Sequence, residues 1–330
     1  MSLPTTMRAL QQTSLRGPQD MHLVTDAAVP KPGPGEVLIR VSAAGVNFAD
    51  VSKAHGTFAD GPRPPYLAGF EAAGEVVARG EGVTGTDVGT HVVGVGDGAF
   101  AEYVVLAAAA AMPVPAGWTE QQALGLVVNW PTALATLRHL GGVTAGQSVL
   151  IQAAAGATGQ AAVTLATHLG ATVLATASPS KHDVVRALGA DHVLDSRGGD
   201  LAGEVLRLTD GAGVDVVLES AGGAAFAASL AAAKRVTGRV VVYGLAGGDA
   251  SVTNHDLVYR HQVHLVGFNL GTFIQAAPHL FGEVMRELCA LVAAGVITPG
   301  RPTSYDLADG PKVLADLESR ATVGKTALLP

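Results

Sequence analysis

Cysteine is almost absent from this chain, which holds Cys289 as its one thiol among 330 residues. A single thiol excludes a disulfide within the chain and a thiolate metal cluster. It also predicts a reducing, cytoplasmic setting. Aromatic residues make up 5% of the sequence, against 42 glycines. This composition favours a turn-rich α/β protein over a helical bundle.

Positive net charge and long apolar runs are also lacking. The formal net charge is −7, so there is no electrostatic reason to expect a nucleic-acid partner. The longest apolar run, Val104 to Met112, is too short to span a bilayer, and the N-terminus lacks the apolar core of a signal peptide. The sequence therefore predicts a soluble protein with neither a nucleic-acid nor a membrane partner.

The most informative stretch of the chain runs from Ser148 to Ala166. It begins as an aliphatic strand over 148–152, continues through a glycine turn and becomes an alanine-rich helix over 158–168. Gly156 and Gly159 have no Cβ to hold a ligand away from the backbone, and the first N–H groups of the helix favour an anion. The turn is therefore expected to bind a pyrophosphate, although Ala154 stands where the strict G-x-G-x-x-G fingerprint has its first glycine.

Two other nucleotide sites fail on the same residues. A Walker loop requires Gly-Lys followed by Ser or Thr, and no Lys follows Gly159. A short-chain dehydrogenase requires a Tyr four residues before a Lys, and none of the five tyrosines has this spacing. A dinucleotide-binding site is the interpretation that remains.

The end of the second predicted strand, 171–177, indicates which dinucleotide binds. An NAD site presents Asp or Glu at this point to hold the ribose hydroxyls. Here the chain continues with Ser178 and Lys181, and Arg197 follows the third strand. A hydroxyl and two cations suit a ribose 2′-phosphate, so we expect NADPH rather than NADH. The alternative is that Ser178 and Lys181 merely begin a helix, since Ser-Pro-Ser is a helix-start signal.

The pattern of strands and helices divides the chain into three segments. Residues 1–122 show short strands separated by glycine and proline, which predicts a mostly antiparallel, barrel-like domain. Residues 123–267 alternate strand and helix, with six strands expected at 148–152, 171–176, 192–195, 214–219, 238–243 and 262–267. This predicts a Rossmann domain with a doubly wound parallel sheet. Residues 268–330 are expected to return to the first domain.

Five motifs together resemble the medium-chain dehydrogenase/reductase superfamily, and in particular its zinc-free quinone oxidoreductase branch, which includes ζ-crystallin. They are Gly33-Pro-Gly-Glu-Val37, Ala44-Gly-Val-Asn-Phe-Ala-Asp50, Gly69-Phe-Glu-Ala-Ala-Gly-Glu-Val76, Thr158-Gly159 and Gly324-Lys325. The resemblance implies a GroES-like catalytic domain interrupted by the Rossmann insertion. It also implies NADPH bound between the two domains and a homodimer joined through the edges of the Rossmann sheets.

The resemblance further implies which residues meet the cofactor. Asn47 and Thr132 would line the nicotinamide and ribose side, and residues 156–159, including Ala157 and Thr158, would meet the pyrophosphate. The remaining implied cofactor residues are Ser220, Ala221, Gly222, Gly244, Leu245, Phe268, Asn269, Leu270 and Lys325. The chain departs from many relatives at Ser52 and Ser196, where a Tyr is common, which affects substrate stacking and one phosphate contact.

No catalytic metal is expected. The zinc-dependent relatives have Cys and His where this chain has Asn47 and Phe70, and zinc needs about three N or S ligands. His261 and His264 have a spacing that suits a metal on a helix, but they flank a predicted strand in which they would face opposite sides. Neither pair is therefore predicted to bind zinc.

Other polar side chains lie near these motifs, and most of them have a structural interpretation. His55 is interpreted as a solvent-facing loop residue rather than a proton donor. Asp50 and Glu71 are carboxylic acids that can act in proton transfer, but both lie in structural motifs, and Glu71 is interpreted as holding a turn. Asn47 is interpreted as functional, because a buried amide must be satisfied by specific partners.

The function predicted from these features is hydride transfer from NADPH to a quinone. A reduced quinone needs no metal or strong acid, whereas a simple ketone forms an alkoxide that normally requires one. An enoyl or enone reductase fits the same fold and cofactor equally well. A non-catalytic NADPH-binding protein is the third hypothesis, because fold alone does not fix function.

Overall fold

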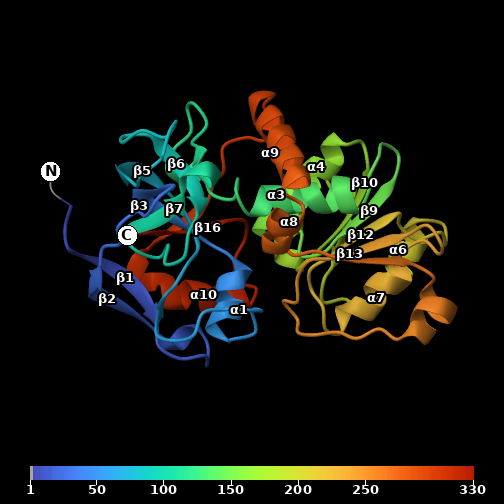
Figure 1. The fold of residues 1–330 in the computed structure, drawn as a ribbon. Helices are drawn as coiled ribbons and strands as arrows, with labels where there is room; N and C mark the ends of the chain where they lie inside the picture. The colour runs from blue at the N-terminus through green and yellow to red at the C-terminus, as the bar shows by residue number, and fades with distance from the viewer. Residues whose placement is uncertain (1–2) are drawn as a thin grey trace. The chain divides into compact units, whose positions relative to one another are not determined.

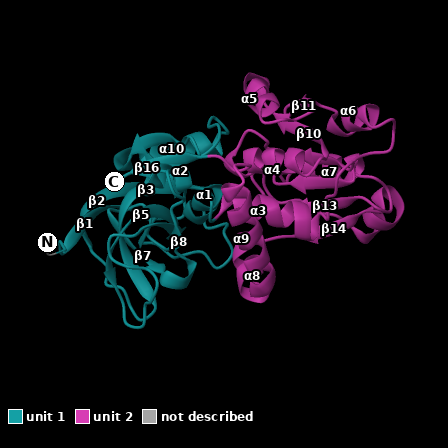
Figure 2. Cartoon of the chain, turned by 90° about the horizontal axis from the view of Figure 1, so that it is seen from above, with its two compact units in different colours: residues 1–127, 299–330 teal, residues 128–298 magenta. Residues whose placement is uncertain are grey.

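The computed structural model describes residues 3–330, which form two compact units (Figure 2). Unit 1 consists of residues up to 127 together with 299–330, and unit 2 consists of residues 128–298. The predicted boundaries were 123 and 268. The chain leaves unit 2 later than expected because helix α9 (Pro278–Ala293) packs against α3 (Asn129–Leu134). The apolar positions Val284 and Leu288, one helical turn apart, are both fully buried.

Unit 2 is built on a six-stranded sheet in the order β11-β10-β9-β12-β13-β14, and all of its strand pairs are parallel (Figure 1). This is the doubly wound Rossmann order, as predicted. Aliphatic strands are expected in such a sheet because helices cover both of its faces. The strands are β9 (Ser148–Ile151), β10 (Thr172–Ala177), β11 (His192–Asp195), β12 (Val216–Glu219), β13 (Arg239–Val242) and β14 (His264–Gly267).

Among the crossover helices of unit 2, the helix predicted at 158–168 is confirmed and begins one residue earlier, as α4 (Ala157–His168). After β10 the chain forms a 3₁₀ turn at Pro179–Lys181, followed by α5 (His182–Ala187). Between β13 and β14 the chain forms a π-helical turn, η5 (Asp256–His261), in place of a full helix. The other helices are α6 (Leu201–Leu208), α7 (Ala225–Ala232) and α8 (Leu270–Ala276), and α3 continues into the π-helical η3 (Ala135–Leu140).

Unit 1 contains two sheets. The smaller sheet has the order β2-β1-β4, and the larger has the order β15-β16-β3-β5-β6-β8, with β7 also paired to β3. All pairs are antiparallel except β15 with β16. The strands are β1 (Thr6–Gln12), β2 (Met21–Ala28), β3 (Glu36–Val46), β4 (Tyr66–Leu67), β5 (Glu71–Arg79), β6 (His91–Val95), β7 (Tyr103–Ala107), β8 (Met112–Pro113), β15 (Thr303–Asp306) and β16 (Thr326–Leu329).

The helices of unit 1 are short and lie beside these sheets. Helix α1 (Phe48–Ala54) was not predicted, although the pattern Asn47-x-x-Asp50 is a helix-start signal. The Asp50 carboxylate accepts a hydrogen bond from the backbone N–H of Asn47 at 2.9 Å. The remaining helices are α2 (Glu120–Ala123), α10 (Gly310–Glu318) and the 3₁₀ turns η1 (Pro18–Asp20), η2 (Ala108–Ala110) and η6 (Leu307–Asp309).

Strand β16 is the element that positions the candidate site of unit 1. It pairs antiparallel with β3, so that Thr326 lies opposite Val46 and Ala327 opposite Gly45. This register brings Lys325, near the end of the chain, beside Asn47 near its beginning.

Among residues 3–330, no helix has both the length and the apolar character needed to cross a bilayer.

Candidate functional site

A buried polar cluster in unit 1 joins Asn47, Glu71 and Lys325. The Lys325 ammonium donates to Glu71 Oε2 at 2.6 Å, to Asn47 Oδ1 at 2.8 Å and to the backbone oxygen of Val46 at 3.2 Å. Asn47 Nδ2 donates in turn to Glu71 Oε2 at 2.8 Å. The amide of Asn47 is therefore held with its oxygen toward the ammonium and its nitrogen toward the carboxylate.

The backbone is shaped to enclose this ion pair. A Cβ at Gly45 would lie 2.5 Å from Glu71 Oε2 and 3.0 Å from Lys325 Cε, so a larger residue there would displace the two charged side chains from this arrangement. The Glu71 side chain is fully buried and that of Lys325 is 9% exposed. Charges taken out of water are tolerated only when their hydrogen-bonding groups are satisfied. Glu71 Oε1 meets this need by accepting from the backbone N–H of Gly125.

These contacts refine two interpretations made from the sequence. Contact of Lys325 with the cofactor stays a prediction, and its ammonium makes three hydrogen bonds inside unit 1. Its geometry is that of a positioning residue for Asn47. Glu71 was interpreted as holding a turn, and it instead joins β3, β5, the loop at Gly125 and the segment before β16.

We predict that Lys325→Met lowers the free energy of unfolding by about 3–5 kcal/mol, because it leaves the Glu71 carboxylate buried without its cation. The double variant Glu71→Gln/Lys325→Met should recover much of this loss. Urea denaturation of both variants measures the effect. Lys312→Met, which removes an exposed pair with Asp316, is the control and should have a much smaller effect. A Lys325→Met protein as stable as the parent would contradict the prediction.

Asp50 is a buried acid next to this cluster. Its Oδ2 accepts from the backbone N–H of Asn47, while its Oδ1 has no hydrogen-bond partner within residues 3–330. Burial raises the pKa of Asp50 from 3.8 to about 7, against the lowering effects of the hydrogen bond from Asn47 and the charges of Lys53 and Lys325. The group can therefore be protonated or ionised near neutral pH.

Because the raised pKa favours the protonated acid in the folded state, the folded chain binds more protons than the unfolded chain between about pH 4 and pH 7. Stability contributed by Asp50 is therefore lost as the pH rises through this range. We predict that the free energy of unfolding of Asp50→Asn, relative to that of the parent, increases by on the order of 2–4 kcal/mol as the pH is raised from about 4 to about 8. Chemical denaturation at both pH values measures this gain. The exposed Asp26→Asn is the control, and a gain independent of pH would refute the prediction.

The glycine turn of unit 2 has the geometry of an anion site. Helix α4 begins after Gly156, and no side chain caps its first N–H groups. A Cβ at Gly159 would lie 2.3 Å from the backbone oxygen of Ala153, so glycine is required for the helix to approach the turn. The Thr158 hydroxyl accepts from Asn129 Nδ2 at 3.0 Å. These uncapped N–H groups fit a pyrophosphate.

Asn129 is a site residue that sequence reasoning missed. It lies three residues before Thr132 in α3, and it links α3 to the glycine turn. Thr132 instead turns its hydroxyl back along the helix, donating to the backbone oxygen of Val128 at 2.7 Å. An amide at the start of a helix is a recognisable signal, since Asn is uncommon in helix interiors.

The cations predicted to hold a phosphate lie at one edge of the sheet. Ala177 at the end of β10 pairs with Asp195 at the end of β11, so Ser178 and Arg197 leave the sheet at neighbouring points. Lys181 is close enough to Arg197 that, after burial, the guanidinium is the second cause lowering the pKa of its ammonium. Like charges held near each other favour a bound anion.

The loops after β12 and β13 pack directly against each other. Ala221 and Gly222 both donate their backbone N–H groups to Glu219 Oε1, at 3.1 and 2.9 Å. A Cβ at Gly222 would lie 2.3 Å from the backbone oxygen of Gly248, and one at Gly244 would lie 2.8 Å from that of Ser220. These glycines are therefore required by the packing of the loops. Contact of this segment and of Leu245 with a cofactor stays a prediction.

The segment after β14 is also fixed locally. The backbone N–H of Phe268 donates to Val242, and the Phe268 ring lies 5.5 Å from that of Phe273. Asn269 Oδ1 accepts from the N–H of Thr272 at 2.9 Å and so caps helix α8, which begins at Leu270. The backbone of these residues is thus held in place by the sheet on one side and the helix on the other.

The residues considered as metal ligands have other roles here. Phe70, which stands at a zinc-ligand position of the zinc-dependent relatives, has its ring centroid 4.6 Å from the Lys53 ammonium. In the separate His261 and His264 pair, His264 Nε2 lies 3.1 Å from the backbone oxygen of Val236. Within residues 3–330, no group of three His, Cys, Asp or Glu side chains is arranged to hold a metal ion.

A parallel Rossmann unit between two segments of an antiparallel unit is the architecture of a two-domain dehydrogenase. Family models agree with it: an alcohol dehydrogenase GroES-like domain matches residues 33–116, and a zinc-binding dehydrogenase domain matches residues 157–289. The chain belongs to the medium-chain dehydrogenase/reductase superfamily of oxidoreductases and resembles its quinone oxidoreductase branch, as predicted.

Individual relatives extend along nearly the whole chain. The rat synaptic vesicle membrane protein VAT-1 homolog is 32% identical over 98% of this chain and 84% of its own length. The structure of Escherichia coli quinone oxidoreductase with NADPH has a TM-score of 0.91, 28% identity and coverage of 98% and 100% of the two chains. The CurK enoyl reductase has a TM-score of 0.88 and 29% identity, with 99% of each chain covered.

Proposed function

We propose that this protein transfers hydride from NADPH to a quinone without a metal. The observation that carries the cofactor assignment is the uncapped start of α4 together with the cations Lys181 and Arg197 beyond β10 and β11. Similarity to the NADPH complex of E. coli quinone oxidoreductase supports both parts of the proposal.

The residues of unit 2 fit the chemical groups of NADPH. The N–H groups of Ala157 and Thr158 would receive the pyrophosphate, and Lys181 and Arg197 would neutralise the 2′-phosphate. NADPH supplies the hydride when bound. The contribution of the protein is to hold the coenzyme by its charged groups, and the remaining task is to hold an acceptor.

We predict that Lys181→Met and Arg197→Met each weaken NADPH binding by about 10- to 100-fold, the usual effect of removing one charged hydrogen-bond partner. NADH lacks the 2′-phosphate, so its affinity should change little. Isothermal titration with both coenzymes measures the change. Arg186→Met, which removes an exposed cation paired with Asp183, is the matched control. Parent protein that binds NADH as tightly as NADPH would refute the assignment.

The polar groups of unit 1 favour an acceptor that needs no strong acid. Asn47 is held between a carboxylate and an ammonium, and Phe70 takes the place of a zinc ligand. A quinone suits such a site, because its reduced oxygens are stabilised by resonance and can be protonated by water. A simple ketone would require a charged or metal donor for its alkoxide.

Two other functions fit the same cofactor. Similarity to the CurK enoyl reductase favours reduction of an activated alkene as the main alternative. A protein that binds NADPH without catalysis is the other alternative, because fold alone does not fix function. The three functions differ in what they do to the coenzyme.

A panel of acceptors separates these functions. We expect the purified protein to oxidise NADPH with 1,4-benzoquinone and to leave NADPH unchanged with enones and enoyl thioesters, as followed by absorbance. Turnover with the enoyl thioester alone would establish the alkene reductase. Tight NADPH binding without turnover on any acceptor would establish the non-catalytic function.

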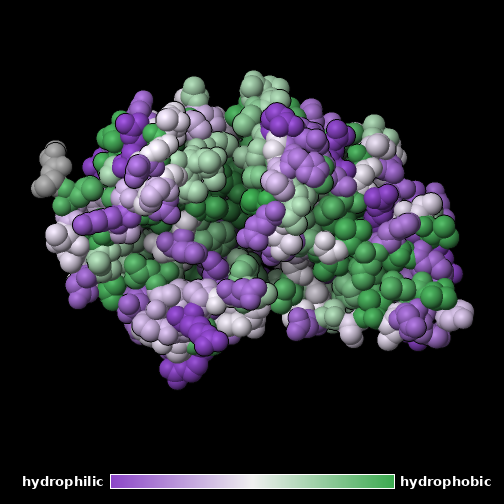
Figure 3. Space-filling view, in the orientation of Figure 1, coloured by the Kyte–Doolittle hydropathy of each residue, from purple (hydrophilic) through white to green (hydrophobic). Residues whose placement is uncertain are grey.

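A cytoplasmic location and a homodimer also remain part of this proposal. Strand β14 is an edge of the sheet, and exposed strand edges are natural pairing sites. Apolar surface gathers where Figure 1 draws β13 and α7 (Figure 3), and Leu265 and Tyr259 are exposed by 37% and 70%. Light scattering of the purified protein tests whether two copies associate.

A further inference from the structure

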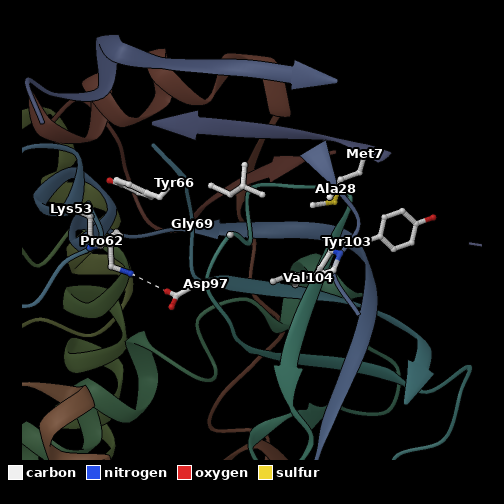
Figure 4. Close-up of a pocket in the computed structure, with 12 residues that line it drawn as sticks. Met7, Ala28, Lys53, Pro62, Tyr66, Gly69, Asp97, Tyr103 and Val104 are labelled. Carbon is white, nitrogen blue, oxygen red and sulfur yellow. Dashed lines mark ion pairs between the residues drawn. The ribbon is translucent and has the colours of Figure 1, made fainter. Parts of the chain in front are cut away.

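Unit 1 contains a pocket that none of the functions above uses. It has a volume of about 270 Å³ and lies between the small sheet, the loop before β4 and strand β7 (Figure 4). Met7 and Tyr103 form its apolar part, and Tyr66, Lys53 and Asp97 lie at its other end. Leu67 also lines the pocket. The pocket therefore has one apolar end and one charged end.

Lys53 is a fixed and largely enclosed cation. It extends from α1, its side chain is 14% exposed, and its ammonium lies 4.6 Å from the ring centroid of Phe70 and 5.5 Å from that of Phe58. Aromatic faces attract an ammonium and hold it in place. They do not neutralise its charge, so the cation still favours an anionic partner.

The partner that Lys53 has in the pocket is weak. Asp97 Oδ1 lies 3.6 Å from the ammonium, beyond hydrogen-bond distance, and the Asp97 side chain is 96% exposed. An exposed ion pair contributes little because water screens it. Within α1 the buried Asp50 also attracts Lys53, but it does not line the pocket. A ligand carboxylate can therefore displace Asp97 at small cost.

We propose that this pocket binds a small amphipathic carboxylate, with its anionic group on Lys53 and its apolar part against Met7, Leu67 and Tyr103. The volume is slightly below that of pockets for drug-sized ligands, about 300–1,000 Å³, so it fits a single ring or a short acyl chain. A phosphate dianion fits less well, because Lys53 is the one cation among the residues that line the pocket.

The proposal does not depend on the cofactor assignment, since Lys53 belongs to unit 1, whereas Lys181 and Arg197, which would hold the phosphate of NADPH, belong to unit 2. Titration is carried out with and without NADPH, so that failure of the cofactor assignment leaves this result unaffected. The probes are benzoate and hexanoate, each compared with its neutral analogue, benzyl alcohol and 1-hexanol.

We expect each acid to bind at least about tenfold more tightly than its alcohol, the effect of one charged hydrogen bond. Lys53→Met should abolish this preference, and Asp97→Asn should strengthen acid binding by removing the competing carboxylate. Leu67→Ala should weaken the acid and the alcohol alike, because it removes apolar contact. Lys312→Met, a lysine of unit 1 outside the pocket, is the control and should bind as the parent does.

Equal binding of acid and alcohol by the parent would overturn the proposal, as would an acid preference that persists in Lys53→Met. Absence of saturable binding by either acid at millimolar concentration would overturn it too. Thermal denaturation verifies that Lys53→Met is folded. Should it not be, Asp97→Asn alone still decides, because a substitution of an exposed side chain that fails to tighten acid binding contradicts the displacement of Asp97.

Discussion

The buried ion pair between Glu71 and Lys325 is the interaction on which unit 1 depends. It joins β5 to the segment before β16, and it fixes both ends of the Asn47 amide. Gly45 is present because any larger side chain would displace the carboxylate. A buried pair of this kind adds little net stability over an apolar core, but losing one partner is costly. Its main effect is therefore to impose a single arrangement on three distant segments.

Much of the fold could be predicted because the chain shows regular periodicity. The aliphatic runs that became β9 to β14 are bounded by glycine and polar residues, and their parallel order is the one that alternation with helices implies. The glycine turn was also predictable, since a turn in which the backbone approaches itself or a ligand closely requires residues without a Cβ, such as Gly156 and Gly159. Ser178, Lys181 and Arg197 follow strands that pair side by side, so their common edge could be inferred from the chain order alone.

Features that depend on distant contacts could not be predicted. Lys325 was recognised as part of the Gly324-Lys325 motif, but its burial arises from the register of β16 against β3. Helix α9 has an apolar stripe that fits either unit, and its packing on α3 decided the boundary. Asp50 was recognised as part of a motif, but its raised pKa comes from burial that no local pattern encodes. Asn129 was overlooked because its partner, Thr158, lies in another element.

The two units differ in whether they are continuous in the sequence. Unit 2 is continuous, whereas unit 1 requires residues 299–330 to supply β15, α10 and β16. During synthesis the Rossmann unit can therefore reach its native structure while the antiparallel unit still lacks its closing strand. Until that strand arrives, one side of β3 has no partner there and the Glu71 carboxylate has no cation. In this incompletely folded state, the unpaired edge of β3 is the surface that a chaperone for exposed strands would bind.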